Sequence, residues 1–509
     1  METTEHSRVS RPRDVYRSFY TSDQRLVSYM LNLLSPEPGH SCLEPCAGDG
    51  AFIDALLAAA IDIQITACEL SSAAVEQLHA KYAGMRNVRV MKCDFLADGP
   101  DLFDTIGTFD RVIGNPPYGG WQDYEKRVSL RTRFPGLYVR ETYGLFLAQA
   151  LRRLRSGGRL VFIVPETFLY LHLQRGLRQL LLENCSVVSL DIFSSSLFPG
   201  VNFGYAKLCI VCLDHRKPEA DHRILIRHPA SLDELGLGTT DAFRVLQAAV
   251  VSRQDQTFPL QGDSREVQLI DNAVLRLGDV ADCVTGIYTG DDRRFLRRSP
   301  LNPRGAGRYR EVNCCEVASP FTGETPLRGL EEPRTFIPVL KGGGVQYLKP
   351  ELWFIDWSLS AVADYRRDKK ARFQNSGFYF RRGIGFPMVT SGRATASVIQ
   401  GHWLFDQSIV GVFPRDHRLL GFLLAFLNST PCWRLLRQIN PSANNSAKYL
   451  RKLPIVLPSS ERLSWFGTTV ESYLARLAEG GPHESHVEHE LNAEVVGLYR
   501  SLIDLSAAA

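Results

Sequence analysis

The sequence predicts an α/β fold with a mostly parallel sheet and helices on both faces, followed by an α+β domain. In residues 1–214, short apolar runs alternate with helical patterns, which is typical of βαβ units. Residues 271–457 instead show short strands, many glycine-containing turns and scattered aromatic side chains. The length of 509 residues exceeds one ordinary core and predicts two domains with a small C-terminal segment.

Each element of the first domain follows from a local pattern. Candidate strands are apolar runs at Ser41–Glu44, Ile63–Cys68, Val88–Met91, Arg111–Ile113, Arg159–Val164, Ser186–Ile192 and Ala206–Leu213. Candidate helices are "DALLAAA", "SSAAVEQLHAKY" with a serine cap, and "TYGLFLAQALRRLRSGG", which we expect to end on its glycine pair. Residues 215–270 are mixed and polar and are interpreted as a connector, whereas residues 458–509 hold two amphipathic helical patterns.

Composition indicates a globular protein. Hydrophobic residues make up 44% and charged residues 22% of the chain. No run approaches the about 18 apolar residues of a membrane span, and the N-terminus "METTEHSRVSRPRD" has no apolar signal-peptide region, which predicts a cytoplasmic protein. The 11 cysteines are irregularly spaced and favour free thiols. The pair Cys209 and Cys212 lacks a second pair and is interpreted as part of a strand rather than a zinc site.

Basic side chains gather in the second half of the chain, although the formal net charge is only +4. Four runs mix arginine or lysine with aromatic residues, at 293–298, 304–310, 365–373 and 378–383. Such runs suit a phosphate backbone, while a solvated surface is the alternative for any single run. Several runs in one domain favour nucleic acid as a partner.

Acidic residues stand at the ends of successive predicted strands. The first strand runs into "LEPCAGDGAF", a turn of small residues that lets a ligand approach backbone N–H groups. Glu69 follows the second strand, at the spacing from which a carboxylate takes ribose hydroxyls, and Asp94 follows the third. For each carboxylate alone, the alternative is a solvent-exposed surface residue without a role in binding. Because ligands of open α/β sheets bind at the carboxyl ends of strands, the ordered set predicts one pocket.

The fourth strand ends in "IGNPPYGGW". Asn115 offers a side-chain carbonyl, and Pro116, restricted by Pro117, presents its backbone carbonyl in an extended geometry. Two such acceptors can hold both hydrogens of an –NH₂ group and free its lone pair for attack on an electrophilic methyl. Tyr118 supplies a flat face on which a base can stack. A Pro-Pro turn packing an aromatic ring would explain the backbone but not the asparagine.

These motifs, in this order, resemble the class I S-adenosylmethionine-dependent amino-methyltransferases that make N6-methyladenine in DNA. A long recognition region after "NPPY" resembles the gamma class of restriction–modification and phage-defence systems. The resemblance covers about Arg11–Asp214 and implies the Rossmann-like class I methyltransferase fold. Glutamine-methylating release-factor enzymes share "NPPY" but carry no large domain after the core.

The resemblance implies S-adenosylmethionine as cofactor and assigns residues to its parts. The segment "SFYTSDQRLVSYML" is similar to the cofactor-gripping motif. The residues implied for the methionine end of the cofactor are Tyr20, Thr21, Glu44, Pro45, Cys46 and Gly48. Those implied for the ribose are Glu69 and Leu70. Asp94 is implied for the adenine amine, Phe95 for the adenine ring, and Asn115 for the position beside the methyl group. The turn reads "CAGDG", where family members vary, so no role is given to Asp49.

The resemblance also implies the catalytic residues Asn115, Pro116, Pro117 and Tyr118, acting on an adenine flipped out of the duplex. The segment "SSSLFPGVNFGYAKLCIVCL" resembles a later motif that places a second aromatic ring against that base. Phe198 is the candidate and Phe203 the runner-up; in the alternative, either is a core residue. We expect direct in-line transfer without a metal and without an obligatory base, and interpret "HESHVEHE" as a solvated helix face.

The second half resembles the family's target-recognition region. The matching segments are "LGDVADCVTGIYTGDDRRFL", "VLKGGGVQYL", "SGRATAS" and "LNSTPCWRLLRQINPSANNSAKYLRKLPI". Glycine-rich turns with basic and polar side chains can contact phosphates and base edges. The residues expected near DNA are Arg293, Arg294, Lys341, Arg393 and Lys448.

The sequence therefore predicts a site-specific DNA adenine-N6 methyltransferase that acts on double-stranded DNA as a monomer and protects host DNA. Two alternatives stay open: methylation of RNA or of a protein amide, which needs no duplex, and a partner-dependent DNA-binding subunit of a phage-defence complex. We expect any restriction activity to come from a separate endonuclease, since no nuclease-like segment precedes the core.

Overall fold

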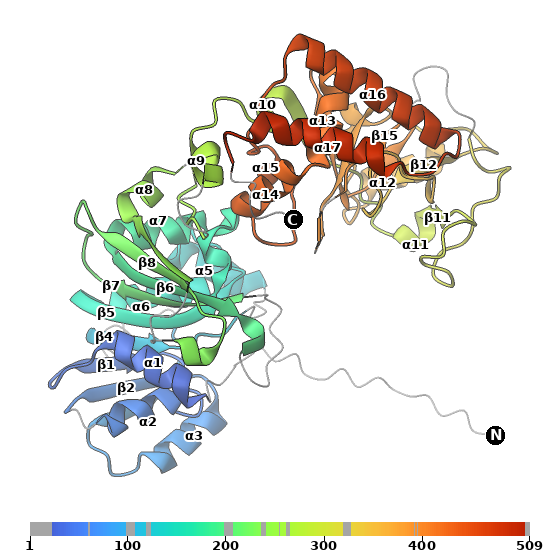
Figure 1. Cartoon of the computed structure of the whole chain (residues 1–509). Coiled ribbons are helices and arrows are strands. Elements are labelled where there is room, and N and C mark those ends of the chain that lie inside the picture. Colours follow the sequence, from blue (N-terminus) through green and yellow to red (C-terminus); the bar gives the residue numbers. More distant parts are fainter. Residues whose placement is uncertain are drawn as a thin grey trace, which may run out of the picture. The chain divides into compact units, whose positions relative to one another are not determined.

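The computed structural model describes residues 23–59, 62–97, 107–118, 124–197, 207–235, 241–253, 255–260, 265–318, 327–390, 392–393 and 395–503. The chain divides into two compact units, Met1–Gly262 and Asp263–Ala509 (Figure 1). Each unit buries apolar side chains in a core of its own.

The first unit is built on one large sheet. Its described strands are β1 (Ser41–Glu44), β2 (Gln64–Glu69), β3 (Val88–Lys92), β4 (Phe109–Gly114), β5 (Leu154–Pro165), β6 (Ser186–Ser194), β7 (Lys207–Asp214), β8 (Arg223–His228) and β9 (Asp241–Leu246). They lie in the order β3-β2-β1-β4-β5-β7-β6-β8-β9. Strands β1 to β5 pair in parallel, and β7 runs antiparallel to both neighbours. The strand order reverses between β1 and β4, where open α/β sheets bind ligands.

The central strands form because their residues are apolar on both faces. Residues 160–164 of β5 and 208–213 of β7 are buried throughout, as expected for strands with helices on both sides. The helices of this unit are α1 (Gln24–Leu34), α2 (Ala51–Ala58), α3 (Ser72–Lys81), α5 (Tyr124–Arg133), α6 (Thr142–Arg153), α7 (Arg175–Asn184) and α8 (Gln247–Ser252). Helix α3 has the serine cap that its sequence predicts, since Ser71 accepts from the Ala74 amide.

The structure corrects the predicted end of one helix. Helix α6 stops at Arg153 and the chain enters β5 at Leu154, so the glycine pair lies in the strand rather than at the end of the helix. The amide of Gly157 donates to the carbonyl of His215, and the amide of His215 donates to the carbonyl of Gly158. Backbone pairing next to β7 therefore outweighs the helical pattern of "RLRSGG".

The first unit also extends beyond the predicted boundary at Asp214. Part of the presumed connector forms β8 and β9, which lengthen the sheet at its β6 edge. Ile224 and Ile226 point into the core, while their neighbours are partly or fully exposed. An apolar run of only three residues, 224–226, flanked by Arg223 and Arg227, is too short to separate a strand from a loop.

The second unit is an α+β domain, as predicted. Its described strands are β10 (Ala281–Thr285), β11 (Leu296–Arg298), β12 (Phe336–Leu340), β13 (Trp353–Asp356), β14 (Gly383–Pro387), β15 (Ser397–Ile399), β16 (Leu404–Phe405) and β17 (Ile409–Pro414). They form two four-stranded sheets, in the orders β10-β17-β14-β15 and β11-β13-β12-β16. Short helices α9 (Arg265–Asp271), α10 (Leu277–Val280), α11 (Asp292–Phe295) and α12 (Leu359–Arg367) connect or flank them.

The C-terminal part of the second unit is helical. It comprises α13 (Leu420–Leu427), α14 (Thr430–Ile439), α15 (Ala447–Leu450), α16 (Ser460–Ala478) and α17 (Ser485–Tyr499), and the last two are the helices predicted from amphipathic patterns. Both pack on the buried α13, as the Phe422–Phe466 and Phe426–Tyr499 ring contacts show. No described helix could cross a membrane by itself; residues 417–427 and 430–439, bent by 78°, meet that length and composition only as a pair.

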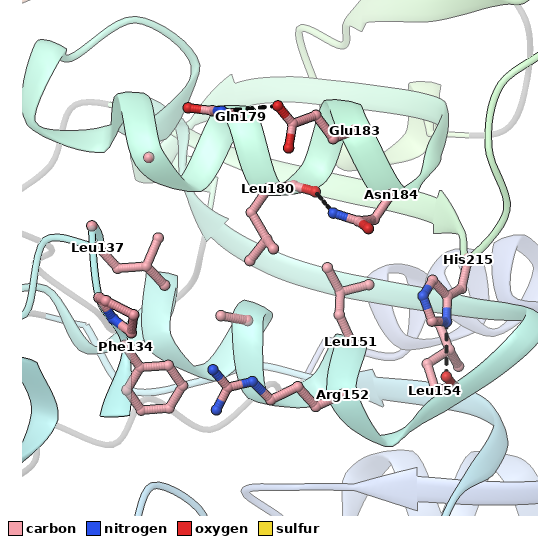
Figure 2. Close-up of a pocket in the computed structure, with 14 residues that line it drawn as sticks. Phe134, Leu137, Leu151, Arg152, Leu154, Gln179, Leu180, Glu183, Asn184 and His215 are labelled. Atoms are coloured by element: carbon pink, nitrogen blue, oxygen red, sulfur yellow. Dashed lines mark hydrogen bonds between the residues drawn. The ribbon is translucent and has the colours of Figure 1, made fainter. Parts of the chain in front are cut away.

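A cavity of about 580 Å³ opens between α6, α7 and the segment before α6 (Figure 2). Leu137, Leu151 and Leu180 line it together with Arg152 and His215. Leu154 and His215 mark the edge where β5 begins and β7 ends. This cavity therefore lies at the edge of the sheet opposite to the carboxyl ends of the parallel strands.

Candidate functional site

The turn after β1 is held from α3. Gly48 and Gly50 adopt positive φ angles of 56° and 84°, which favour glycine. The hydroxyl of Tyr82 lies 3.0 Å from the carbonyl oxygen of Gly50 and 2.9 Å from Asp54 Oδ1. Lys81 Nζ donates to Asp54 Oδ2 at 2.5 Å. These contacts fix the backbone of the small-residue turn before any ligand binds.

Glu69 joins this turn to the end of β2. Its Oε2 accepts from the Gly48 amide at 2.9 Å, and its Oε1 accepts from the Leu70 and Ser71 amides at 2.8 Å each. A carboxylate offers about four acceptor sites, so Glu69 keeps capacity for two hydroxyl groups. The structure thus brings the first two predicted strand tips into direct contact.

Asp94 lies after β3 and meets a residue that sequence reasoning missed. Its Oδ1 accepts from the Leu96 amide at 3.0 Å, and its Oδ2 forms an ion pair with Lys126 Nζ at 2.8 Å. Lys126 lies on α5, the next described helix after "NPPY". No local pattern marks this lysine, because its position depends on how α5 packs beside β3.

Phe95 is buried rather than open to a ligand. Its ring centroid lies 5.5 Å from that of Phe146 on α6. Contact between Phe95 and the cofactor ring remains a prediction.

The "NPPY" segment leaves the tip of β4 and turns toward β5. The hydroxyl of Tyr118 donates to the carbonyl of Ile163 at 2.8 Å and lies 2.5 Å from Asn115 Oδ1. Thr142 Oγ1 donates to the Pro117 carbonyl at 2.5 Å. Only 2% of the Tyr118 surface is exposed, so stacking on a base remains a prediction that requires a ring face to become accessible. Asn115 is partly buried.

Gly114 lets the β1 turn approach β4 closely. A Cβ atom at this position would lie 3.4 Å from each of Cys46 Sγ, Pro45 Cδ and Phe162 Cε1. The turn predicted to hold the methionine end of the cofactor therefore packs directly against the strand that carries Asn115. This contact places the turn at Pro45 and Cys46 next to the end of β4.

Glu44 at the end of β1 is an unusual carboxyl group. It is 2% exposed, and its Oε2 has no hydrogen-bond partner among the described residues. Burial raises the pKa of Glu44 well above its usual value, and the charges of Asp49, Glu69 and Asp54 add to that shift. A cationic ligand would relieve this carboxyl group, and S-adenosylmethionine carries a sulfonium and an ammonium group.

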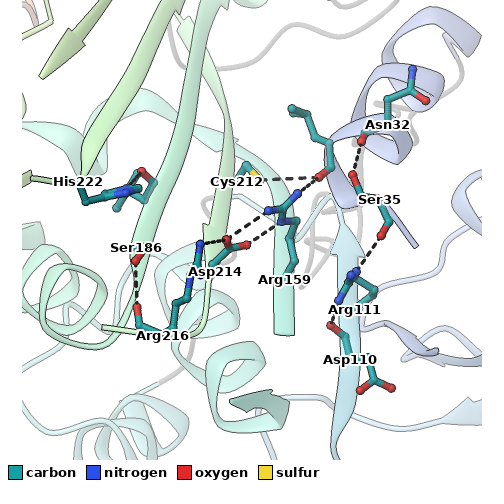
Figure 3. A network of polar contacts seen from close by, with 12 residues as sticks. Asn32, Ser35, Asp110, Arg111, Arg159, Ser186, Cys212, Asp214, Arg216 and His222 are labelled. Carbon is teal, nitrogen blue, oxygen red and sulfur yellow. Dashed lines mark hydrogen bonds and ion pairs between the residues drawn. The ribbon is translucent and has the colours of Figure 1, made fainter. Parts of the chain in front are cut away.

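Helix α1 is anchored on the sheet through its C-terminal end (Figure 3). Arg159 Nη1 donates to the carbonyl of Leu33 at 3.2 Å, and Arg159 Nε pairs with Asp214 at 2.7 Å. Arg111 Nε donates to the carbonyl of Ser35 at 3.2 Å. The predicted cofactor residues Tyr20 and Thr21 precede α1 and lie outside the described residues, as do Phe198 and Phe203.

The predicted DNA contacts lie in different environments. Arg293 on α11 and Lys448 on α15 are exposed. Arg294 pairs with Asp364 at 2.6 Å, and Arg393 donates to the carbonyl of Asn428 at 2.6 Å. These two arginines have protein partners that a phosphate would have to replace or share.

Lys341 fits its predicted role poorly. Its side chain is 21% exposed and bridges Asp406 at 2.6 Å and Asp292 at 3.0 Å. Burial is the largest single influence and acts to lower the pKa of Lys341, but Asp406 and Asp292 together raise it above its usual value. The structure therefore gives Lys341 an internal ion-pairing role, because two carboxylates already neutralise its charge.

Comparison with known proteins identifies the region around this site. Residues 68–198 match the family described as Eco57I restriction-modification methylase. This part of the chain is therefore similar to that family. The methylase domain so defined contains Glu69, Asp94 and the whole "NPPY" segment. The family match ends before β7 and covers no part of the second unit.

Curated relatives match longer parts of the chain. The type II methyltransferase M.HincII of Haemophilus influenzae is 26% identical over 213 residues, covering 38% of this chain and 39% of that protein. The adenine-specific methyltransferase PglX of Lacticaseibacillus casei strain Zhang is 25% identical over 206 residues, covering 39% of this chain and 16% of PglX. The chain thus matches well under half the length of these two relatives.

One solved structure resembles nearly the whole chain. The type IIL restriction-modification enzyme MmeI in complex with DNA aligns with a TM-score of 0.57 and 11% identity, over 96% of this chain and 73% of that one. This similarity concerns the fold. With the strand order and the methylase match, it confirms the predicted class I methyltransferase fold followed by an α+β domain.

Proposed function

We propose that this chain transfers a methyl group from S-adenosylmethionine to the N6 amine of an adenine at a specific site in double-stranded DNA. The observation that carries the proposal is the contact at Gly114 between the turn at Pro45 and Cys46 and the strand that ends in Asn115. A cofactor held by that turn presents its methyl group to an amine held by Asn115. The similarity to the adenine-specific methyltransferase PglX supports adenine as the target base.

The residues of the first unit suit the cofactor. Glu69 faces the turn with acceptor capacity for ribose hydroxyls, and Asp94 stands one strand further for the adenine amine. The buried carboxyl group of Glu44 complements a cation near the methionine end. Bound cofactor supplies an activated methyl group, while these side chains bind and orient it and exclude water.

Asn115 and Pro116 act on the target amine. The side-chain carbonyl of Asn115 and the backbone carbonyl of Pro116 accept one hydrogen each. These bonds localise the nitrogen lone pair and aim it at the methyl group, so most of the rate comes from positioning. Adenine must leave the duplex to reach this site, and stacking on Tyr118, with Phe198 or Phe203 opposite, offsets the cost of about a few kcal/mol.

The biological setting is part of the proposal. We infer that the second unit binds DNA and selects the sequence, and that methylation protects host DNA in a restriction–modification or defence system. A cognate endonuclease or defence subunits would then be separate partners of a cytoplasmic, monomeric enzyme. The wet, basic surfaces of target-recognition domains suit the exposed arginines of this unit.

A methyl-transfer assay tests the proposal. Purified protein is incubated with labelled S-adenosylmethionine and unmethylated plasmid, single-stranded RNA or a mixture of proteins. We expect label on duplex DNA only, and at least about a 100-fold loss in Asn115→Ala with cofactor binding retained. Asn184→Ala, an exposed asparagine on α7 at the other edge of the sheet, is the matched control. Label on RNA or protein but not on DNA would overturn the proposal.

A further inference from the structure

Glu166 is a buried acid next to the proposed target site, and none of the roles above uses it. It directly follows β5 and begins a short 3₁₀ turn, Glu166–Leu169. Strand β5 lies beside β4, with Phe162 opposite Gly114 in the register. Because the two strands are parallel, Glu166 and Asn115 emerge at the same edge of the sheet from neighbouring strands.

The turn of Glu166 is connected to Tyr118 through side chains. The hydroxyl of Tyr143 lies 3.0 Å from Thr167 Oγ1, next to Glu166 in the chain. The ring of Tyr143 meets that of Tyr118 edge to face, with a centroid separation of 6.4 Å. The Tyr118 hydroxyl in turn donates to β5 at Ile163. The 3₁₀ turn and the "NPPY" segment therefore form one packed assembly.

The carboxyl group of Glu166 lacks a full set of partners. It is 5% exposed, and within the described part of the chain Oε1 accepts one long hydrogen bond, of 3.3 Å, from the Tyr170 hydroxyl. Oε2 has no hydrogen-bond partner among the described residues. Buried polar groups are nearly always hydrogen-bonded, so an unpaired oxygen beside a binding site indicates a ligand contact.

The surroundings of Glu166 favour its neutral form. Burial is the largest influence and raises its pKa, while Lys207 at the start of β7 and the Tyr170 hydroxyl act in the opposite direction. The thiol of Cys209 on β7 also faces it and is itself held neutral by burial, which raises its pKa. A protonated carboxyl group donates one hydrogen bond.

The chemistry of adenine requires such a donor. Its Watson–Crick edge combines the N6 amine, a donor, with N1, an acceptor, and flipped bases are read on this edge. The two groups proposed to hold the N6 amine, Asn115 Oδ1 and the Pro116 carbonyl, are acceptors and leave N1 without a donor. We propose that Glu166, as the neutral acid, donates a hydrogen bond to N1 of the target base and so helps to select adenine. This inference rests on the proposed function and names a specificity-determining residue for it.

The test compares DNA carrying adenine with DNA carrying 1-deazaadenine, which has C–H in place of N1, at the methylated position. Glu166→Gln keeps a donor and Glu166→Ala removes it. The measured quantity is the ratio of the methylation rate on adenine to that on 1-deazaadenine. We expect this ratio to be about 10-fold higher for wild type and Glu166→Gln than for Glu166→Ala, because the alanine variant lacks one buried hydrogen bond to the base. The two bases differ in intrinsic reactivity, but this difference affects every variant equally and therefore cancels when the rate ratios of two variants are compared.

A pH profile gives a second readout that a structural role would not produce. In wild type, methylation should be full below the raised pKa of Glu166 and fall as pH rises through it, whereas Glu166→Gln should be insensitive in that range. Glu183→Gln, an exposed acid on α7, is the matched control and should follow wild type.

Equal discrimination by wild type and Glu166→Ala, or identical behaviour of the Gln and Ala variants, would overturn the inference. If the variants fail to fold, the wild-type pH profile on its own decides, because a flat profile contradicts a neutral-acid donor. Absence of any methylation of adenine DNA by wild type would instead contradict the proposed function itself.

Discussion

The carboxylate of Glu69 is held by hydrogen bonds from the protein backbone. Three backbone amides, from Gly48, Leu70 and Ser71, fix the orientation of its carboxylate, which we propose binds the ribose hydroxyls. Because its geometry is fixed in advance, little entropy is lost when the cofactor binds. The effect of Glu69 should therefore appear in cofactor affinity rather than in the methyl-transfer step.

Glu69→Ala should weaken S-adenosylmethionine binding by about 10- to 100-fold, since hydrogen bonds to a charged acceptor contribute about 1.5–3 kcal/mol each. At saturating cofactor, the rate of methyl transfer should change little. Isothermal titration calorimetry measures the first quantity and single-turnover kinetics the second. Glu76→Ala on the exposed face of α3 is the control. Unchanged affinity in Glu69→Ala would refute the assignment of this residue to the cofactor.

At the scale of elements, the turn between β1 and α2 depends on contact with α3. Gly50 caps α2 with a φ of 84°, and a Cβ atom there would lie 2.3 Å from the Tyr82 hydroxyl. An alanine at this position faces two costs, the left-handed backbone and the collision with a buried side chain.

Gly50→Ala should lower the free energy of unfolding by about 2–4 kcal/mol and weaken cofactor binding. Gly84→Ala separates the two costs, because Gly84 has the same φ of 84° with nothing within 4 Å of its Cβ position. It should lose about 1 kcal/mol and bind cofactor normally. Chemical denaturation and calorimetry provide both measurements. Equal effects of the two substitutions would show that the contact with Tyr82 is unimportant.

A buried ion pair ties the late strands to α1. Arg227 on β8 contacts Asp191 on β6 and the hydroxyl of Tyr29 on α1. Asp191 is 1% exposed, so removal of the arginine leaves a buried carboxylate without its cation.

Arg227→Met should therefore destabilise the first unit by about 3–5 kcal/mol. The exposed pair of Arg418 and Asp416 provides the comparison, and Arg418→Met should cost less than about 1 kcal/mol. Thermal melting followed by circular dichroism distinguishes them. A small effect in Arg227→Met would mean that β8 and β9 are dispensable additions to the sheet.

At the scale of the whole molecule, we propose that the first unit binds the cofactor and the second unit binds DNA. The basic side chains of the second unit do not all contribute equally, because some are engaged within the protein. Arg293 and Lys448 are exposed, whereas Lys341 bridges two carboxylates.

Arg293→Ala and Lys448→Ala should each weaken DNA binding and lower the slope of log K against log salt by about 1, as expected when one phosphate contact is lost. Lys341→Met should instead lower the melting temperature, because it leaves two carboxylates unpaired. Fluorescence anisotropy over a salt series measures the slopes, with Arg86→Ala in the first unit as control. An unchanged slope in both alanine variants would remove these residues from the DNA surface.

The sequence predicts the first unit well where apolar patterns are strong. Strands β1 to β7 occur near their predicted positions because buried parallel strands require continuous apolar runs. Strands β8 and β9 were missed because their apolar runs are short and are interrupted or flanked by charged residues. Likewise, the roles of Lys126 and Glu166 depend on packing between segments distant in sequence, which leaves no local signal. The burial of Tyr118 and Phe95 has the same origin.

The most direct test of the account is to map modified bases in DNA exposed to the protein. The full chain and its Asn115→Ala variant are expressed in a host without adenine methylation, and plasmid DNA is sequenced by a method that detects N6-methyladenine. The account predicts N6-methyladenine at one recurrent short sequence with the wild type and none with the variant. Absence of N6-methyladenine from DNA, while the wild type binds S-adenosylmethionine, would contradict it.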